Sequence, residues 1–312
     1  MEYRRVGNSG LKVSVLSVGG WLTFGNTVDT DTTREIIRAA VDQGVNSIDL
    51  ADVYAKGEAE RVVGKVLGDF RRSDLVVASK VFWPMSDAIT DRGLNRKHIF
   101  ESIDRTLKNL RVDYLDIYYC HREDPETPLH ETMSAMNDLI RVGKVLYWGT
   151  SMWQPKSLQS AHALATDRGL FAPIVEQPQY SLLHRWVEKK IMPTVTQLGM
   201  GLMIWSPLAG GILTGKYCDG VPSGSRGAAT PRWVEEDLTA ENIERVKMFC
   251  KLAKEMGVLP GPLAISWLMH RPEVSSVILG ATSRKQIEEN LEAAHVKLPE
   301  SVDTQIRKIF RA

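Results

Sequence analysis

Four polar residues of different chemistry occur at or near the ends of short apolar segments. Asp49, Lys80 and His121 each lie at the end of such a segment, and Tyr54 follows the first of them by a few positions. A free tyrosine, with a pKa near ~10, is a poor proton donor at neutral pH, but a neighbouring ammonium lowers that pKa. We therefore expect Lys80 to lower the pKa of Tyr54 and Asp49 to orient Lys80. His121 would hydrogen-bond a carbonyl, to which Tyr54 donates a proton as general acid.

An alternation of apolar and amphipathic segments would bring these four residues together. Apolar segments that read as strands occur at 15–20, 45–49, 75–79, 114–119, 144–149, 173–177, 201–205 and 275–280. Helical patterns occur near 58–69, 96–110, 130–142, 155–168, 186–198 and 283–294. Eight such units predict one α/β domain over 1–312, a (β/α)8 TIM barrel, in which the carboxyl ends of all strands share one face.

The remaining segments decorate this barrel. A turn signal at 8–10 predicts an N-terminal β-hairpin, and further helices are expected at the C-terminus. A first helix should be capped by Thr30 or Asp31 and end at Gly44. The stretch 206–238 is rich in Gly and Pro and too long for an ordinary connection, so it is predicted to be a functional loop over one barrel end.

Bulk properties exclude several classes of function. A net charge of +1 gives no general attraction to nucleic acid or to an anionic membrane. No apolar stretch approaches the roughly 20 residues of a membrane helix, and the N-terminus has no signal-peptide core, so the cytoplasm is expected. Cys120, Cys218 and Cys250 are widely spaced and predicted to be reduced thiols. The other histidines show no ligand spacing, so no metal site is predicted.

Seven segments, in order along nearly the whole chain, carry a resemblance to a known family. They are IDLADVYAKGEAE, SKVFW, CHREDPETP, YWGTSMW, VEQPQYS, WSPLAGGILTGKY and GATSRKQIEEN. The chain resembles the aldo-keto reductases, and within them the branch that includes the potassium-channel β-subunits. This resemblance implies a (β/α)8 barrel that transfers hydride between NADPH and a small aldehyde or ketone.

The resemblance also implies roles for individual residues. Asp49, Tyr54, Lys80 and His121 match the catalytic tetrad of the family. Trp21, Tyr54, Trp83 and His121 would contact substrate. Ser151 and Gln177 would hold the nicotinamide carboxamide, and Trp205 would lie against the nicotinamide ring. Further cofactor contacts are implied for Gly20, Trp21, Asp49, Ser206, Pro207, Leu208 and Gly210.

Two positions depart from the pattern of the relatives. Channel β-subunits typically have Asn where this chain has His121, which favours an ordinary reductase. Many relatives have Asn or Arg where this chain has Met152, so one polar contact to the nicotinamide is expected to be missing.

Three elements indicate a cofactor that bears several phosphates. The segment 210–216 fits a P-loop pattern superficially, but Tyr217 stands where a magnesium-binding Ser or Thr is needed, which excludes nucleotide hydrolysis. We interpret it as a Gly-rich loop over a pyrophosphate, with Lys216 adding charge and Arg226 near the adenine-side phosphate. A helix start after Gly280 would bind a 2′-phosphate through its N-terminal amides and Thr282, with positive charge from Arg284 and Lys285. The resemblance further implies that Gln286, Glu289 and Asn290 contact the adenosine. NADPH is therefore predicted over NADH.

Two functions from different classes remain open. The first is an NADPH-dependent carbonyl reductase, and the second is an NADPH-binding regulatory β-subunit of a potassium channel. A non-redox barrel isomerase is disfavoured by the many cofactor signatures. The resemblance implies a homo-oligomer, a tetramer or larger. Substrate choice would depend on the loops 84–95 and 206–238 and on the segment after 295. The sequence does not identify the preferred substrate.

Overall fold

Eight parallel strands close into a barrel. In this computed structural model, which describes residues 1–311, each strand from β3 to β10 pairs with the next, and β10 pairs with β3. This confirms the predicted (β/α)8 barrel. The strands are β3 (Leu16–Gly19), β4 (Ser47–Asp49), β5 (Val76–Val81), β6 (Leu115–Cys120), β7 (Val145–Thr150), β8 (Val175–Glu176), β9 (Gly201–Ile204) and β10 (Val274–Leu279).

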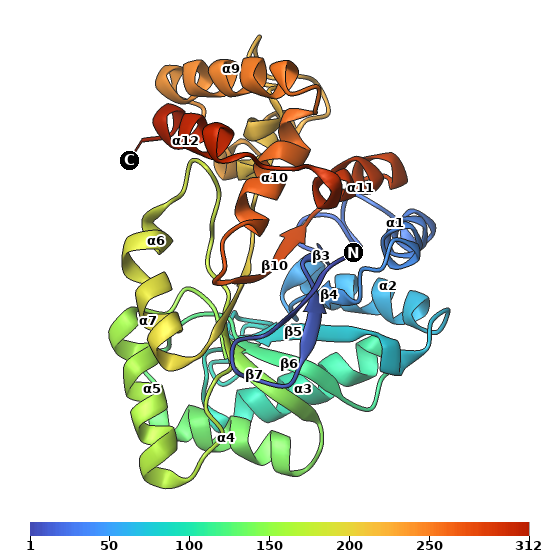
Figure 1. Ribbon diagram of the computed structural model, residues 1–312. Coiled ribbons are helices and arrows are strands. Elements are labelled where there is room, and N and C mark those ends of the chain that lie inside the picture. The colour runs from blue at the N-terminus through green and yellow to red at the C-terminus, as the bar shows by residue number, and fades with distance from the viewer. Residues whose placement is uncertain (312) are drawn as a thin grey trace.

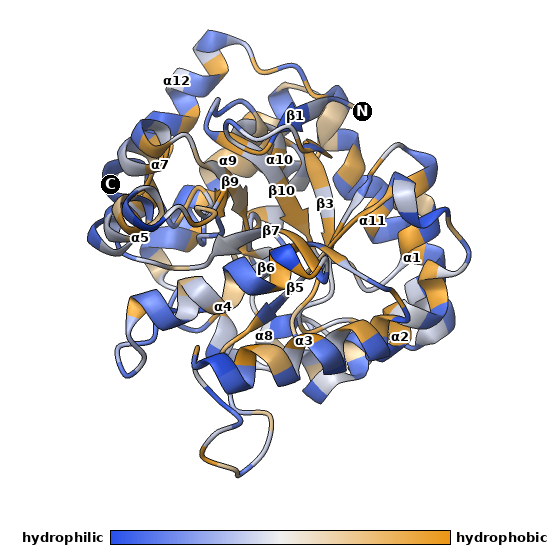
Figure 2. Ribbon diagram, turned by 90° about the horizontal axis from the view of Figure 1, so that it is seen from below, coloured by the Kyte–Doolittle hydropathy of each residue, from blue (hydrophilic) through white to orange (hydrophobic). Residues whose placement is uncertain are grey.

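Helices surround the strands, as the view in Figure 2 shows. They are α1 (Thr30–Asp42), α2 (Glu58–Leu67), α3 (Arg96–Leu110), α4 (Leu129–Arg141), α5 (Pro155–Arg168), α6 (Trp186–Lys190), α7 (Met192–Leu198), α8 (Arg226–Ala229), α9 (Ala240–Glu255), α10 (Pro260–Met269), α11 (Arg284–Leu291) and α12 (Glu300–Ile309). Helices α9, α10 and α12 gather at one end of the molecule in Figure 1. Among residues 1–311, no helix is both long and apolar enough to cross a bilayer.

Three predicted helix boundaries are wrong. The cap of α1 is Asp29, whose carboxylate accepts a hydrogen bond from Thr32 N at 2.8 Å, and not Thr30 or Asp31. The helix predicted at 186–198 is two helices separated at Ile191. The second begins at Met192, and Pro193 has no N–H with which to continue the hydrogen bonds of the first. The helix predicted at 283–294 ends at Leu291 and is followed by a 3₁₀ turn.

The predicted N-terminal hairpin covers one end of the barrel. It consists of β1 (Tyr3–Arg5) and β2 (Lys12–Ser14), paired antiparallel. Val6 and Val13 are fully buried in the same apolar cluster as barrel residues such as Ala78 and Ile117. Arg4 Nη1 donates to the carbonyls of Met269 (2.6 Å) and Val274 (2.9 Å), which fixes the hairpin to the last strand. The opposite end of the barrel remains for the site.

Strand periodicity explains why a lysine lies inside this barrel. Successive side chains of a strand point to opposite faces, so Val76, Ala78 and Lys80 share one face. Val76 and Ala78 belong to the cluster in the barrel interior, whereas Val77 and Val81 belong to the cluster between the strands and the helices. Lys80 therefore points inward, at the carboxyl end of β5.

Candidate active site

The ammonium of Lys80 is the centre of a buried hydrogen-bond network. Its Nζ donates to Asp49 Oδ2 (2.5 Å), to the Leu50 carbonyl (2.7 Å) and to the Tyr54 hydroxyl (3.2 Å). Lys80 is fully buried and Asp49 nearly so. The second carboxylate oxygen of Asp49 accepts from Gln177 Nε2 at 2.8 Å. The structure thus brings together Asp49, Tyr54 and Lys80, three of the four residues that were predicted to meet at the strand ends.

Tyr54 is held by a strained turn after β4. It begins the 3₁₀ segment Tyr54–Gly57, in which Ala55 and Lys56 have φ values of +48° and +52°. Non-glycine residues rarely adopt these left-handed values, so the turn stores strain that the surrounding contacts must offset. Its geometry directs the hydroxyl of Tyr54 back to Lys80 at the barrel mouth.

The predicted lowering of the Tyr54 pKa is wrong. Burial raises the pKa of Tyr54 above its usual value, and the Lys80 charge offsets this only in part. Burial alone would lower the pKa of Lys80, but the charge of Asp49 and the contacts of Tyr54 raise it above its ordinary value. At neutral pH Tyr54 is therefore a protonated phenol beside a charged ammonium. That state suits a proton donor.

His121 lies beside Tyr54 as a neutral imidazole. The two ring centroids are 5.9 Å apart in an edge-to-face arrangement. Burial, together with the charges of Lys80 and Arg122, holds the pKa of His121 well below its usual value. Its Nδ1 is buried and has no hydrogen-bond partner among residues 1–311. All four predicted catalytic side chains thus meet at the carboxyl ends of β4, β5 and β6.

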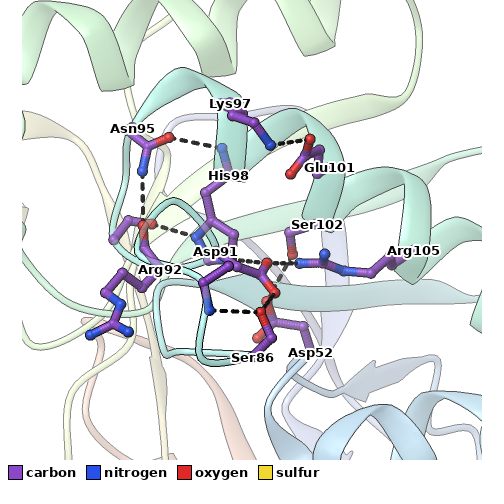
Figure 3. Close-up of polar contacts among 12 residues, drawn as sticks. Asp52, Ser86, Asp91, Arg92, Asn95, Lys97, His98, Glu101, Ser102 and Arg105 are labelled. Carbon is purple, nitrogen blue, oxygen red and sulfur yellow. Dashed lines mark hydrogen bonds and ion pairs between the residues drawn. The ribbon is translucent and has the colours of Figure 1, made fainter.

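Trp83 forms a wall of this site on the loop between β5 and α3. Its ring lies 6.2 Å from that of His121 and is 37% exposed. Asp91 fastens the loop, because its carboxylate accepts from Ser86 Oγ (2.8 Å) and Arg105 Nη2 (2.6 Å), as drawn in Figure 3. The predicted substrate wall at Trp83 is therefore anchored to α3.

A second aromatic group lies at the ends of β3 and β9. Trp21 packs edge-to-face against Trp205 (centroids 5.7 Å apart) and against Trp233 (4.9 Å). The guanidinium carbon of Arg226 lies 5.7 Å from the centroid of Trp21. A Cβ at Gly20, the residue before Trp21, would come within 2.6 Å of the Leu50 side chain, which would have to move to admit a larger residue.

The predicted carboxamide contacts lie at the ends of β7 and β8. Ser151 Oγ donates to the Gln177 carbonyl at 2.8 Å, and both residues are buried. The side-chain amide of Gln177 contacts Asp49, so it belongs to the same network as Lys80. Met152 follows Ser151 with a left-handed φ of +60°.

The segment after β9 winds tightly over the barrel mouth. Ser206 and Ala209 have φ values of +57° and +47°, and Gly210 has +67°. This winding turns the backbone through Pro207 and Leu208, and the Leu208 carbonyl accepts from Gly211 N at 2.9 Å. The predicted functional loop 206–238 is thus ordered into short helical turns, including α8.

Lys216 and Arg226 are two cations of this loop. Neither has a carboxylate within 4.0 Å among residues 1–311. Burial lowers the pKa of Arg226, which is consistent with a cation that lacks a charge partner. Arg226 beside the indole of Trp21, with Lys216 in the same loop, fits an aromatic cofactor that carries phosphates.

The helix start after β10 fits a phosphate less well than predicted. Arg284 pairs with Glu288 (2.8 Å) and Lys285 with Glu289 (3.8 Å), both exposed pairs along α11. Each of these cations thus has an exposed acidic neighbour on its own helix, and their contribution to binding a phosphate stays a prediction. The backbone N–H and hydroxyl of Thr282 both donate to Gln286 Oε1. Gly280 is exposed and Asn290 is buried behind this turn.

Sequence reasoning missed one residue of the site. Arg122 follows His121 directly and lies with its guanidinium 5.5 Å from the ring of Trp83. Glu176, at the end of β8 and not part of the Lys80 network, accepts from Thr150 Oγ1 at 2.5 Å, and burial raises its pKa to about 8. The position of Arg122, one residue after a predicted catalytic histidine, was the signal that could have identified it.

Comparisons with known proteins agree with this geometry. The family model described as "Aldo/keto reductase family" matches residues 15–311. A protein of Oryza sativa subsp. japonica named "Probable voltage-gated potassium channel subunit beta" is 44% identical, over 97% of this chain and 95% of its own. One of Arabidopsis thaliana with the same name is also 44% identical, over 95% and 92%.

A third relative comes from a fungus. The protein of Schizosaccharomyces pombe named "Putative voltage-gated potassium channel subunit beta" is 41% identical, over 94% of this chain and 88% of its own. The family model and the closed barrel agree with each other, and the relatives match this chain over most of their length. The chain belongs to the aldo/keto reductase family.

Proposed function

We propose that this protein reduces an aldehyde or ketone to the alcohol with NADPH, and that Tyr54 is the general acid. The observation that carries this proposal is the hydrogen bond between the Tyr54 hydroxyl and the buried Lys80 ammonium. A neutral His121 beside that hydroxyl supports it. Membership of the aldo/keto reductase family supports redox chemistry at a carbonyl.

The four side chains have separate tasks in this reaction. Bound NADPH supplies the hydride that adds to the carbonyl carbon. His121 donates a hydrogen bond that orients the carbonyl oxygen, and Tyr54 gives its hydroxyl proton to that oxygen as negative charge develops there. The Lys80 ammonium then stabilises the resulting phenolate. Asp49 keeps Lys80 charged and in place.

The residues proposed to hold NADPH lie around the same mouth. Ser151 and Gln177 would contact the carboxamide, and Trp205 the nicotinamide ring. Lys216 and Arg226 would neutralise phosphates, because neither cation has an acidic partner in residues 1–311. Thr282 and Gln286 would contact the adenosine end, where Arg284 contributes less because Glu288 compensates its charge.

The replacement Tyr54→Phe tests the role of the phenol. It removes one hydroxyl and leaves the ring, so NADPH affinity should stay within about twofold while turnover falls roughly 10²–10⁴-fold. Turnover is measured as loss of NADPH absorbance with a panel of aldehydes and ketones, and affinity by quenching of tryptophan fluorescence. Undiminished turnover in Tyr54→Phe would overturn the assignment.

A regulatory function is the second candidate, favoured by the printed names of the three relatives. In that case the protein binds NADPH as part of a potassium-channel complex, in an assembly of four or more copies. Tight NADPH binding without turnover across the carbonyl panel, together with co-purification with a channel, would favour this function. Rapid multiple turnover would favour the reductase.

A further inference from the structure

Arg122 lies between Trp83 and Ser151 at the candidate site. It lies at the carboxyl end of β6, immediately after His121. Its Nη1 donates to the His121 carbonyl at 2.5 Å and lies 3.5 Å from Ser151 Oγ. The guanidinium carbon is 5.5 Å from the centroid of Trp83. The cation is therefore surrounded by the wall residue, the histidine that would orient a carbonyl, and a serine at the barrel mouth.

This guanidinium is only half buried and has few partners. Its two hydrogen-bond acceptors are a neutral carbonyl and a neutral hydroxyl, although a guanidinium has five N–H donors. No carboxylate of residues 1–311 lies within 4.0 Å of it. Burial lowers the pKa of Arg122, and Tyr54 and the charge of Glu176 oppose this only in part.

The acidic residues nearest to Arg122 in sequence and space are already engaged. The Glu123 carboxylate accepts the Gln154 backbone N–H, and Glu176 accepts from Thr150 Oγ1 and from Trp153 N. Arg105 of α3, by contrast, pairs with Asp91 at 2.6 Å. An arginine without such a partner at the mouth of a site has donors available for a ligand.

We propose that Arg122 binds a carboxylate carried by the substrate, so that the preferred substrates are aldehydes bearing a carboxylate. The inference rests on the proposed reductase function, because it names the substrate class of the same site. A planar guanidinium matches a carboxylate through two parallel hydrogen bonds, which a point charge cannot do. The indole face of Trp83 suits an apolar or aromatic spacer between the carbonyl and the carboxylate.

A pair of matched substrates tests this assignment. 4-Carboxybenzaldehyde carries the carboxylate, and its methyl ester has the same aldehyde and ring without the charge. The wild-type protein should show a kcat/KM at least about tenfold higher for the acid. Arg122→Gln should lose most of this preference, with kcat/KM for the acid falling about 10–100-fold through KM and that for the ester staying within about threefold.

Two further variants sharpen the result. Arg122→Lys keeps the positive charge but not the two parallel N–H donors of the guanidinium, so it should keep only part of the preference for the acid. Arg71→Gln replaces an exposed arginine before β5, at the other end of the barrel, and should behave as wild type. Melting temperature and NADPH affinity are measured for each variant. A loss of NADPH affinity in Arg122→Gln with equal effects on both substrates would overturn the proposal and assign Arg122 to the cofactor.

A binding measurement separates this inference from the reductase proposal. Titration calorimetry of 4-(hydroxymethyl)benzoate into the NADP⁺-loaded protein needs no turnover. Binding that Arg122→Gln weakens about tenfold or more supports the carboxylate contact even if no aldehyde is reduced. Absence of binding to wild type, or equal binding to both proteins, contradicts it. Turnover of the ester with no preference for the acid would leave the reductase standing and refute the role of Arg122.

Discussion

Residues near β4 and β5 and residues in the loop after β9 meet at one barrel mouth but are held in opposite ways. Lys80 makes three hydrogen bonds within a buried network, and one of its acceptors is the carboxylate of Asp49. Lys216 and Arg226 have no acidic partner in residues 1–311. The first group balances its charge within the protein, whereas the second would balance it only with a bound anion. Variants on the two sides should therefore fail differently.

The largest effect is expected from Lys80→Met. This variant leaves the buried Asp49 carboxylate without its cation, which should destabilise the fold by about 3–5 kcal/mol. Turnover should also fall at least about 10²-fold, because no ammonium remains to stabilise the phenolate of Tyr54. Denaturant melts and NADPH-coupled assays measure the two effects.

The double variant Asp49→Asn/Lys80→Met separates stability from catalysis. Removing both charges should recover much of the lost stability but none of the turnover. If the double variant is as unstable as Lys80→Met alone, the cost does not come from an unpaired carboxylate, and the comparison with the loop after β9 loses its basis.

The next effect concerns the cations of the loop after β9. Lys216→Met combined with Arg226→Gln should lower the affinity for NADPH at least about tenfold and the affinity for NADH far less. NADPH carries one more phosphate than NADH, and that phosphate would lose its cationic partner. Stability without ligand should not fall, since neither cation is paired. Fluorescence titration with both cofactors measures the ratio, and Lys251→Met is an exposed control. Equal losses for NADPH and NADH would refute the assignment of these cations to the phosphates.

A smaller effect on the Lys80 side concerns Asp52, whose carboxylate accepts from Ser102 Oγ at 2.7 Å, as Figure 3 shows. Burial raises the pKa of Asp52 from 3.8 to about 7. The folded protein therefore binds a proton that the unfolded chain has lost, so Asp52 makes stability fall as pH rises from about 4 to 7 and has no further effect above that range.

The replacement Asp52→Asn should remove this dependence. The loss of unfolding free energy between pH 5 and pH 8 should become smaller by about 2 kcal/mol, an order-of-magnitude figure. Urea unfolding at both pH values measures it, and Glu176 contributes a slope of the same sign that remains. An unchanged difference between the two pH values would show that Asp52 is ionised in the folded protein at pH 5.

The smallest effect is expected at α11. Arg284 is exposed and paired with Glu288, so Arg284→Ala should weaken NADPH by only about twofold to threefold and leave the melting temperature unchanged. The reciprocal variant Glu288→Gln removes the acidic partner of Arg284 and should raise the affinity for NADPH slightly. A large loss of NADPH affinity in Arg284→Ala would show that Arg284 binds a phosphate of the cofactor, as proposed for Lys216 and Arg226.

The parts of the fold and site that could be predicted depend on local pattern. Continuously apolar strands and capped helices repeat along the chain, and strand ends share a face, so Asp49, Lys80 and His121 could be placed together before any coordinates. The break at Ile191 was missed because an apolar helical period continues across Pro193, although the proline interrupts the backbone hydrogen bonds.

The parts that could not be predicted depend on burial and on contacts between distant segments. The sign of the Tyr54 shift follows from the competition between desolvation and the Lys80 charge, and a sequence shows only the charge. The compensation of Arg284 by Glu288 could have been read from their spacing of four residues on a helix. The lack of an acidic partner for Arg122 could not have been read from the sequence, because it depends on where the carboxylates of distant segments lie in the fold.

The seam between β3 and β10 has a consequence for biosynthesis. Across it, the hydroxyls of Ser17 and Ser276 are 2.5 Å apart although 259 positions separate them in the chain. While the ribosome is still making the last units, β3 presents an unpaired apolar edge, which is the kind of surface that promotes aggregation. The 259 positions between these two serines must be synthesised before this edge is covered, so protection of the nascent chain matters most before β10 appears.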